Sequence, residues 1–534
     1  MPGVVDRVIA RTGAAARRLI VPARNDLRRQ VEQKLGDLAG AAAPVVTGPV
    51  LIDAMWDNPN YWLRLALARA ALGTAALKEV GLVGRWRRAE CAGTLRRFGI
   101  EVTGPEAFDL ADDFAVAARA LVTPLREVSE ILGWQLPEEF PAAIFYDAIL
   151  KRQRAAMVDI RDPNLVRHVA EGLEAIALAV RVIGDVAPGL VLLSHAVNFH
   201  YAALAWVAAR HGIPVIVLFG NYGTPRFWRI SKPADVFECV DRPYEPDIAA
   251  LTPAGADMLA SRGRQYLERR RGGQTRDLGA QQAFALRRGL VDRDTMASRF
   301  GRSRDVQIVA VYASNWFDFP HACGMTQFRD FLDWLDATVS VAKQNTDVNW
   351  LFKPHPCDEW YGGITLKDLL PGDIAPHIRL AEPDWNGAAV TDAVDAIVTY
   401  HGTVGIEAAA IGKPVLAADR GWYDDCGFVF RPLNRQAYLA ALGGEWWRGI
   451  DLAHARRRAE IFAGWYFEPP NWQDGFVTGD DSEQFGLYQG HIQVLARNGP
   501  EIAREVALLR EWYASGQPFY HTYKVGAWVR GGCS

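Results

Sequence analysis

The feature that most constrains the fold is an alternation of short apolar runs with helical stretches. Residues 190–194 (LVLLS) follow a Pro-Gly pair and form a short apolar run, which predicts a buried strand. A helix is expected over residues 202–210, and residues 214–219 (PVIVLF) predict a second buried strand. Strand, helix and strand at this spacing form a βαβ unit, which implies a parallel sheet with helices on both faces.

The same alternation restarts in the second half of the chain. A further strand is expected early, at residues 49–54. Because 534 residues exceed one ordinary domain, the sequence predicts the α/β class, with two doubly wound, Rossmann-like parallel-sheet domains. The strands of the second domain are expected at residues 306–313, 349–353, 377–380, 396–400 and 414–418, with a helix over 327–345.

The changes in pattern divide the chain into five segments. Residues 1–40 are predicted to form a basic leader helix, and residues 41–267 the N-terminal α/β domain. Residues 268–304 are predicted to be a solvated, Arg-rich connector, with phosphate binding as the alternative interpretation. Residues 305–432 are predicted to form the C-terminal α/β domain, and residues 433–534 a helical tail that packs back on the domains.

Charge and composition narrow the classes of function. The chain has 59 basic and 62 acidic residues, so we expect no nucleic-acid partner, since nucleic-acid binders usually carry a basic excess. The six cysteines form no CxxC pair, which argues against a disulfide framework or a zinc site. No apolar run approaches ~18 residues and no secretory signal is recognisable, so a cytoplasmic protein without a transmembrane helix is expected.

The basic leader has two interpretations. One is a peripheral anchor on an anionic membrane at its inner face. The other is a solvated, poorly ordered helix. We favour the second, because the apolar side of the segment is rich in Ala and holds no Trp or Phe.

In open parallel sheets, ligands bind beyond the carboxyl ends of the strands. The stretch Lys353-Pro354-His355-Pro356 directly follows a predicted strand. Two prolines stiffen this loop, so His355 is held where it can donate to a phosphate oxygen, with the Lys353 charge nearby. The alternative is a stiff turn whose His is satisfied within the protein.

A second candidate loop follows the predicted strand 396–400. His401 and Gly402 lie in a glycine turn, and an Ala-rich helix begins after it. The N-terminus of such a helix suits a phosphate, and Thr403 can either cap the helix or bind the phosphate itself. Glu407 lies one turn further on, where its carboxylate can accept hydrogen bonds from ribose hydroxyls.

A third candidate loop follows the first strand of the second half. Asn315, Asp318 and His321 are polar residues in an aromatic setting, SNWFDFPH. They are expected to contact the phosphates or sugar of a ligand or to lie near the reaction. The alternative is a packed loop.

These motifs resemble a known family. NWLFKPHP, followed about forty residues later by YHGTVGIEAAAIGKPV, looks like the C-terminal half of bacterial capsule and surface-polysaccharide glycosyltransferases. Their relatives include capsule Kdo transferases, polysialyltransferases and teichoic-acid polymerases. The resemblance implies a GT-B fold, in which two domains face a cleft. It also implies that His355 and Thr403 bind the phosphates of a nucleotide sugar and that Glu407 holds the ribose.

The implied activity is transfer of a sugar from a nucleotide-sugar donor to a glycan acceptor. The acceptor would be a capsule or O-antigen-type polysaccharide or its lipid-linked precursor. The alternatives are a nucleotide-sugar 2-epimerase, a polyol-phosphate transferase of the same fold, or a non-catalytic scaffold for glycan assembly. No Asp-x-Asp run follows a strand, so we expect neither a metal nor a cofactor besides the donor.

The transfer needs a base that takes the proton of the acceptor hydroxyl. Asp53 follows the first predicted strand, and His195 and His200 follow the strand 190–194. We name these three residues and His321 as the candidate catalytic groups.

The chain holds 18 Trp residues, which is a large number for its length. Trp316, Trp360 and Trp422 lie on loops at the expected cleft, where a flat ring can stack on a base or a sugar. Trp334 and Trp350 lie on a predicted helix and strand, where packing is the expected role.

Overall fold

The computed structural model describes residues 29–467 and 499–531, apart from short gaps. The basic leader up to residue 28 and Trp360 therefore lie outside the described residues. The gaps are residues 31, 35, 39–42, 55, 56, 58, 85–87, 109, 111, 112, 220–224, 239, 240, 276, 286, 359–361, 371–373 and 424.

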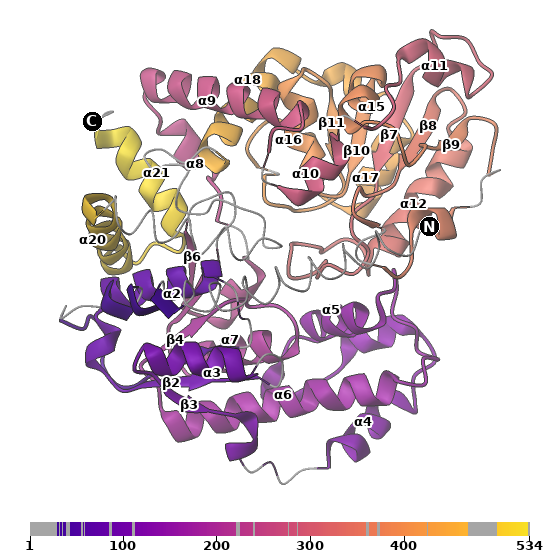
Figure 1. The fold of residues 1–534 in the computed structure, drawn as a ribbon. Coiled ribbons are helices and arrows are strands. Elements are labelled where there is room, and N and C mark those ends of the chain that lie inside the picture. Colours follow the sequence, from indigo (N-terminus) through magenta and orange to yellow (C-terminus); the bar gives the residue numbers. More distant parts are fainter. Residues whose placement is uncertain are drawn as a thin grey trace, which may run out of the picture.

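The protein contains two sheets (Figure 1). The first has the order β3-β2-β1-β4-β5-β6, in which all pairs are parallel except β5 with β6. Its strands are β1 (Val50–Asp53), β2 (Glu79–Leu82), β3 (Glu101–Thr103), β4 (Leu190–Leu193), β5 (Val215–Phe219) and β6 (Arg226–Ile230).

The second sheet is wholly parallel and has the order β11-β10-β7-β8-β9. In each sheet the strand order reverses beside the first strand, between β1 and β4 and between β7 and β10, and such a reversal is where ligands bind in open α/β sheets. The strands are β7 (Ile308–Tyr312), β8 (Asn349–Lys353), β9 (Ile378–Leu380), β10 (Ala396–Thr399) and β11 (Val415–Ala417).

Helices cover both faces of each sheet, because successive strand residues point to opposite sides. In the second sheet, Ile308 and Ala310 pack in one core with α16 (Val404–Ala410) and α18 (Leu452–Tyr466). Val309 and Val311 point to the other face and pack in another core with α12 (Phe331–Gln344). In the first sheet, α6 (Leu165–Val186) and α7 (Phe199–Arg210) share one core, and α2 (Pro59–Leu72) and α3 (Arg88–Arg97) share the opposite one. The predicted pair of doubly wound domains is confirmed, and it is the GT-B-like arrangement that the resemblance implied.

The helices alternate with the strands, and the helical segment between β3 and β4 is divided into α4 (Phe114–Val122), α5 (Ala142–Gln153) and α6 (Leu165–Val186). None of the described helices combines the length and apolar character that a membrane span needs. The helices of the first domain are α2 (Pro59–Leu72), α3 (Arg88–Arg97), α4 (Phe114–Val122), α5 (Ala142–Gln153), α6 (Leu165–Val186) and α7 (Phe199–Arg210). Those of the second are α12 (Phe331–Gln344), α14 (Leu366–Leu369), α15 (Gly387–Ala393), α16 (Val404–Ala410), α17 (Arg435–Leu442) and α18 (Leu452–Tyr466).

The segment between the domains is helical as well. It holds α8 (Glu245–Ala249), α9 (Pro253–Arg271), α10 (Leu278–Ala283) and α11 (Arg293–Ser298). Helix α9 packs along α18, and the two helices cross at Gly263 and Gly464, where a Cβ on either glycine would overlap the backbone of the other helix. The expectation of a wholly solvated connector is wrong at Arg270, whose side chain is buried by these contacts.

The C-terminal helices α20 (Gly499–Ser515) and α21 (Tyr520–Gly531) lie beside the first domain (Figure 1). Ile502, Leu509 and Trp512 of α20 join the core that contains α2. The chain therefore crosses from the second domain back to the first, and a helical C-terminal region is confirmed.

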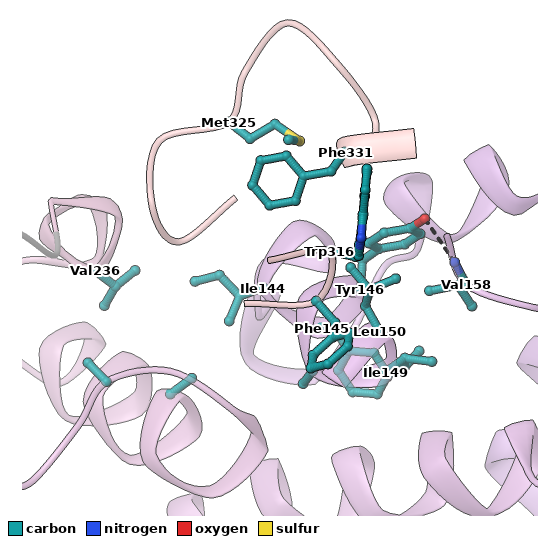
Figure 2. Close-up of a cluster of buried hydrophobic side chains, with 14 of the residues drawn as sticks. Ile144, Phe145, Tyr146, Ile149, Leu150, Val158, Val236, Trp316, Met325 and Phe331 are labelled. Carbon is teal, nitrogen blue, oxygen red and sulfur yellow. Dashed lines mark hydrogen bonds between the residues drawn. The ribbon is translucent and has the colours of Figure 1, made fainter. Parts of the chain in front are cut away.

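The two domains meet where α5 packs against the loop between β7 and α12. Figure 2 shows Ile144, Tyr146 and Leu150 of α5 close to Trp316 and Phe331 of the second domain. The indole of Trp316 is only 1% exposed. The expectation that Trp316 stacks on a ligand is therefore wrong, because the contact between the domains covers its ring.

Polar groups of α5 fix the same contact. The Asp147 carboxylate accepts hydrogen bonds from the backbone N–H groups of His321 and Ala322 at 2.9 and 3.0 Å, and it lies 2.7 Å from His321 Nδ1. Burial alone would lower the pKa of His321, but the adjoining Asp147 carboxylate raises it above its ordinary value. The Tyr146 hydroxyl donates to Asp330 at 2.6 Å.

We expect His321→Leu to destabilise the protein, because Asp147 would remain buried without its cationic partner. Removing one partner of a buried pair costs about 3 kcal/mol or more, and urea unfolding followed by Trp fluorescence measures the loss. The control is Arg448→Ala, which removes an exposed pair with Glu445 and should change the free energy of unfolding by about 0.5 kcal/mol or less. Equal effects of the two substitutions would contradict the role given to His321.

Candidate active site

A cavity of about 600 Å³ lies at the carboxyl ends of β7, β8 and β10. These strands flank the reversal of strand order in the second sheet, so their loops diverge and leave a space between them. The eight residues that the sequence predicted for the donor site all line this cavity, and they come from three loops, the end of β8 and the helix α16 (Val404–Ala410). They are Asn315, Asp318, Lys353, His355, His401, Gly402, Thr403 and Glu407.

Lys353 ends β8 and is a buried cation that lines the cavity. Its side chain is 7% exposed, and no carboxylate of the described residues lies within ion-pair distance of its ammonium group. Burial lowers the pKa of Lys353 to about 8, and the nearby Arg288 charge acts in the same direction. A buried ammonium without a carboxylate partner is costly, so this position favours an anionic ligand.

His355 follows two residues later, between its two prolines. Burial lowers the pKa of His355 to about 4, so its imidazole is neutral at pH 7. The backbone N–H of Cys357 donates to Nδ1 of His355 at 3.3 Å. The ring proton therefore resides on Nε2, and this tautomer makes Nε2–H a hydrogen-bond donor.

The loop after β7 adds an amide and a carboxylate. Asn315 is 9% exposed, and its Nδ2 has no hydrogen-bond partner among the described residues. A buried amide donor that lines a cavity is suited to an acceptor supplied by a ligand. Asp318 lies at the edge towards the first domain, where Lys151 of α5 donates to its Oδ1 at 2.9 Å.

The loop after β10 is fixed by the two aromatic residues that follow β11. Trp422 Nε1–H donates to the His401 carbonyl at 2.9 Å, and the Tyr423 hydroxyl donates to the Gly402 carbonyl at 2.6 Å. Thr403 begins α16 without using its hydroxyl as a cap, so the hydroxyl is left for a ligand. Trp422 lines the cavity as expected, and its stacking on a ligand stays a prediction.

Glu407 lies in the first turn of α16, lines the cavity and is paired with a residue from the connector. Arg270 Nε donates to Glu407 Oε1 at 2.6 Å, and Arg270 Nη1 donates to Asp277 Oδ2 at 3.0 Å. The sequence gives no local reason to choose Arg270, because it is one of three consecutive arginines. The available signal is its spacing of seven residues, two helical turns, from Gly263, which places both on the face of α9 that meets α18.

The four candidate catalytic residues do not line the cavity. Asp53 is fully buried and accepts hydrogen bonds from the backbone and hydroxyl of Ser194. His195 lies in the loop between β4 and α7, where burial lowers its pKa to about 4, and His200 lies in the first turn of α7. His321 lies in the contact between the domains. Their assignment as catalytic groups stays a prediction.

Comparison with known proteins adds context to this geometry. No family model matches the chain. Over 125 residues it is 27% identical to Protein FixF of Sinorhizobium fredii. This alignment covers 23% of this chain and 29% of FixF. The chain thus aligns with less than a third of this relative.

Several solved structures show a distant likeness. UDP-GlcNAc 2-epimerase from Neisseria meningitidis bound to UDP-GlcNAc is 11% identical, with 84% of this chain and 99% of that chain covered and a TM-score of 0.21. The spinosyn rhamnosyltransferase SpnG is 12% identical, with 88% of this chain and 100% of that chain covered and a TM-score of 0.22. The glycosyltransferase SnogD from Streptomyces nogalater is 16% identical, with 79% of this chain and 95% of that chain covered and a TM-score of 0.24. TM-scores this low assign no function.

Gly405→Ala is expected to destabilise the loop after β10. A Cβ there would overlap the Tyr423 hydroxyl and ring, and overpacking of this kind costs about 1–3 kcal/mol, which outweighs a gain of about 1 kcal/mol from helix propensity. Gly184→Ala in α6 is the control, because nothing lies within 4 Å of its added Cβ. Chemical unfolding should show a loss for the first and no loss for the second, and a gain for both would contradict the close contact.

Proposed function

We propose that the protein is a glycosyltransferase that binds a nucleotide-sugar donor in this cavity. The acceptor is a capsule or O-antigen-type surface polysaccharide or its lipid-linked precursor. The observation that carries the proposal is Lys353, a buried cation that has no carboxylate partner among the described residues and that lines a cavity of nucleotide-sugar size.

The groups around Lys353 suit a diphosphate. His355 offers a neutral Nε2–H donor, and Asn315 offers an unpartnered amide donor in the same cavity. Thr403 adds a hydroxyl on the third loop. These donors are fixed by strands and prolines before a ligand arrives, so little reorganisation is needed when charge develops on the leaving phosphate.

In the proposed transfer, an acceptor hydroxyl oxygen attacks the anomeric carbon of the donor sugar. The bond from that carbon to the phosphate oxygen breaks, and the nucleotide leaves with the electron pair. Lys353 and the neutral donors stabilise the departing phosphate, while a base takes the hydroxyl proton. The Asp318 edge of the cavity faces α5 of the first domain, which favours entry of the acceptor from that side.

The first test of the proposal is ligand binding. A thermal-shift and calorimetric screen against CMP, CDP, UDP and GDP should give a selective stabilisation, since a ligand that binds the native state raises its stability by mass action. Absence of binding by all four nucleotides would overturn the proposal. Incubation of the matching nucleotide sugar without an acceptor then separates transfer from epimerisation, because only an epimerase converts the donor alone.

Lys353→Gln is expected to weaken nucleotide binding by about 10-fold to 100-fold, since a charge-assisted hydrogen bond contributes about 1.5–3 kcal/mol. Lys343→Gln is the matched control, because Lys343 lies exposed on α12 and does not line the cavity. Isothermal titration measures both affinities. Similar affinities for the two variants would remove Lys353 from the site.

Nucleotide affinity is also expected to depend on pH. The lowered pKa of Lys353, about 8, means that its ammonium group is mostly protonated at pH 7 and loses its proton as the pH rises through 8. The protonated form attracts the phosphates, so affinity should be constant below this range and should fall above it. Titrations from pH 6.5 to 9.5 measure the profile, with Lys353→Gln expected to be flat over the same range.

A further inference from the structure

The lining of the cavity includes Arg270, a residue that the proposed function does not use. Arg270 lies near the C-terminal end of α9, and its side chain is 4% exposed. It contacts carboxylates from two other elements, Glu407 of α16 and Asp277 at the start of α10. Three segments that line the cavity are therefore joined at one guanidinium group.

The position of Arg270 is fixed from both sides. The crossing of α9 and α18 at Gly263 sets the distance between these helices, and Arg264 forms two hydrogen bonds with Glu460 of α18, at 3.0 and 2.9 Å. Beyond α18, the Phe467 ring lies 5.5 Å from the Arg270 guanidinium and stacks on Tyr266. Such packing holds a guanidinium in one orientation.

A fixed Arg270 fixes Glu407 in turn. Its Nε–H donates to Oε1 of Glu407, whereas no hydrogen bond to Oε2 is formed among the described residues. Glu407 lines the cavity, so the second oxygen is the acceptor that a ligand can reach. A carboxylate oxygen held in one place selects ligands that bring a hydroxyl donor to it.

Resting on the proposed function, we propose that Arg270 is a positioning residue of the donor site. It holds the Glu407 carboxylate so that Oε2 accepts a hydrogen bond from a ribose hydroxyl of the nucleotide, and it thereby makes the site selective for ribonucleotides. Its single positive charge lies beside both Glu407 and Asp277 and reduces their repulsion of the phosphates of the ligand.

The test compares ribonucleotides with analogues that lack the hydroxyls. CMP, CDP, UDP and GDP and their 2′,3′-dideoxy forms are titrated into the full chain, and the ratio of the two dissociation constants is the readout. The wild-type protein should bind the ribonucleotide about tenfold or more tightly, because a hydrogen bond to a charged group is lost in the analogue. Equal affinities in the wild type would overturn the proposal without any variant.

Arg270→Gln and Arg270→Lys should bring this ratio close to one and leave the affinity for the dideoxy form within about threefold. Arg269→Gln is the matched control, since Arg269 is the exposed neighbour on α9 and lies outside the cavity lining, and it should keep the wild-type ratio. An unchanged ratio in a folded Arg270 variant would overturn the proposal. Failure of the proposed function is distinct, because then neither form of any nucleotide binds to the wild-type protein.

Discussion

Parallel pairing of β7 with β8 on one side and β10 on the other is the constraint on which the site depends. It brings the carboxyl ends of three strands to one edge, although the strands begin at residues 308, 349 and 396. The chain then continues to β9 in one direction and to β11 in the other, so the loops separate and a cavity forms between them. Each polar group of the cavity therefore needs only a short loop to reach it.

Residues outside the second sheet complete the cavity. Helix α9 supplies Arg270 to one wall, and α5 of the first domain supplies Lys151 to the edge at Asp318. Both helices are themselves held by buried contacts, α9 by its crossing with α18 and α5 by the pair of Asp147 with His321. The stability of the domain contact and the shape of the cavity are thus linked through the same packing.

The sequence predicted the strands that a local pattern determines, and it missed features that depend on contacts between residues far apart in the chain. Strands such as β8 and β10 are short, apolar and bounded by turns, so periodicity finds them. Strand β6 was missed, because RFWRI carries two arginines, and its antiparallel pairing with β5 follows from tertiary structure. Arg270 was missed for a similar reason, since Glu407 lies 137 residues away. The Trp316 ring looked available on its loop, and only the approach of α5 buries it.

The charges that line the cavity favour one kind of ligand. Its three carboxylates are paired within the protein, Glu407 and Asp277 with Arg270 and Asp318 with Lys151. His355 and His401 have pKa values lowered to about 4 by burial and carry no charge at neutral pH. Lys353 is the cation among the described lining residues that has no carboxylate within ion-pair distance, and such a charge in a partly buried cavity favours an anion over a neutral sugar chain. This preference supports the proposal that the phosphates of the donor bind in the cavity and that the acceptor approaches from the first domain.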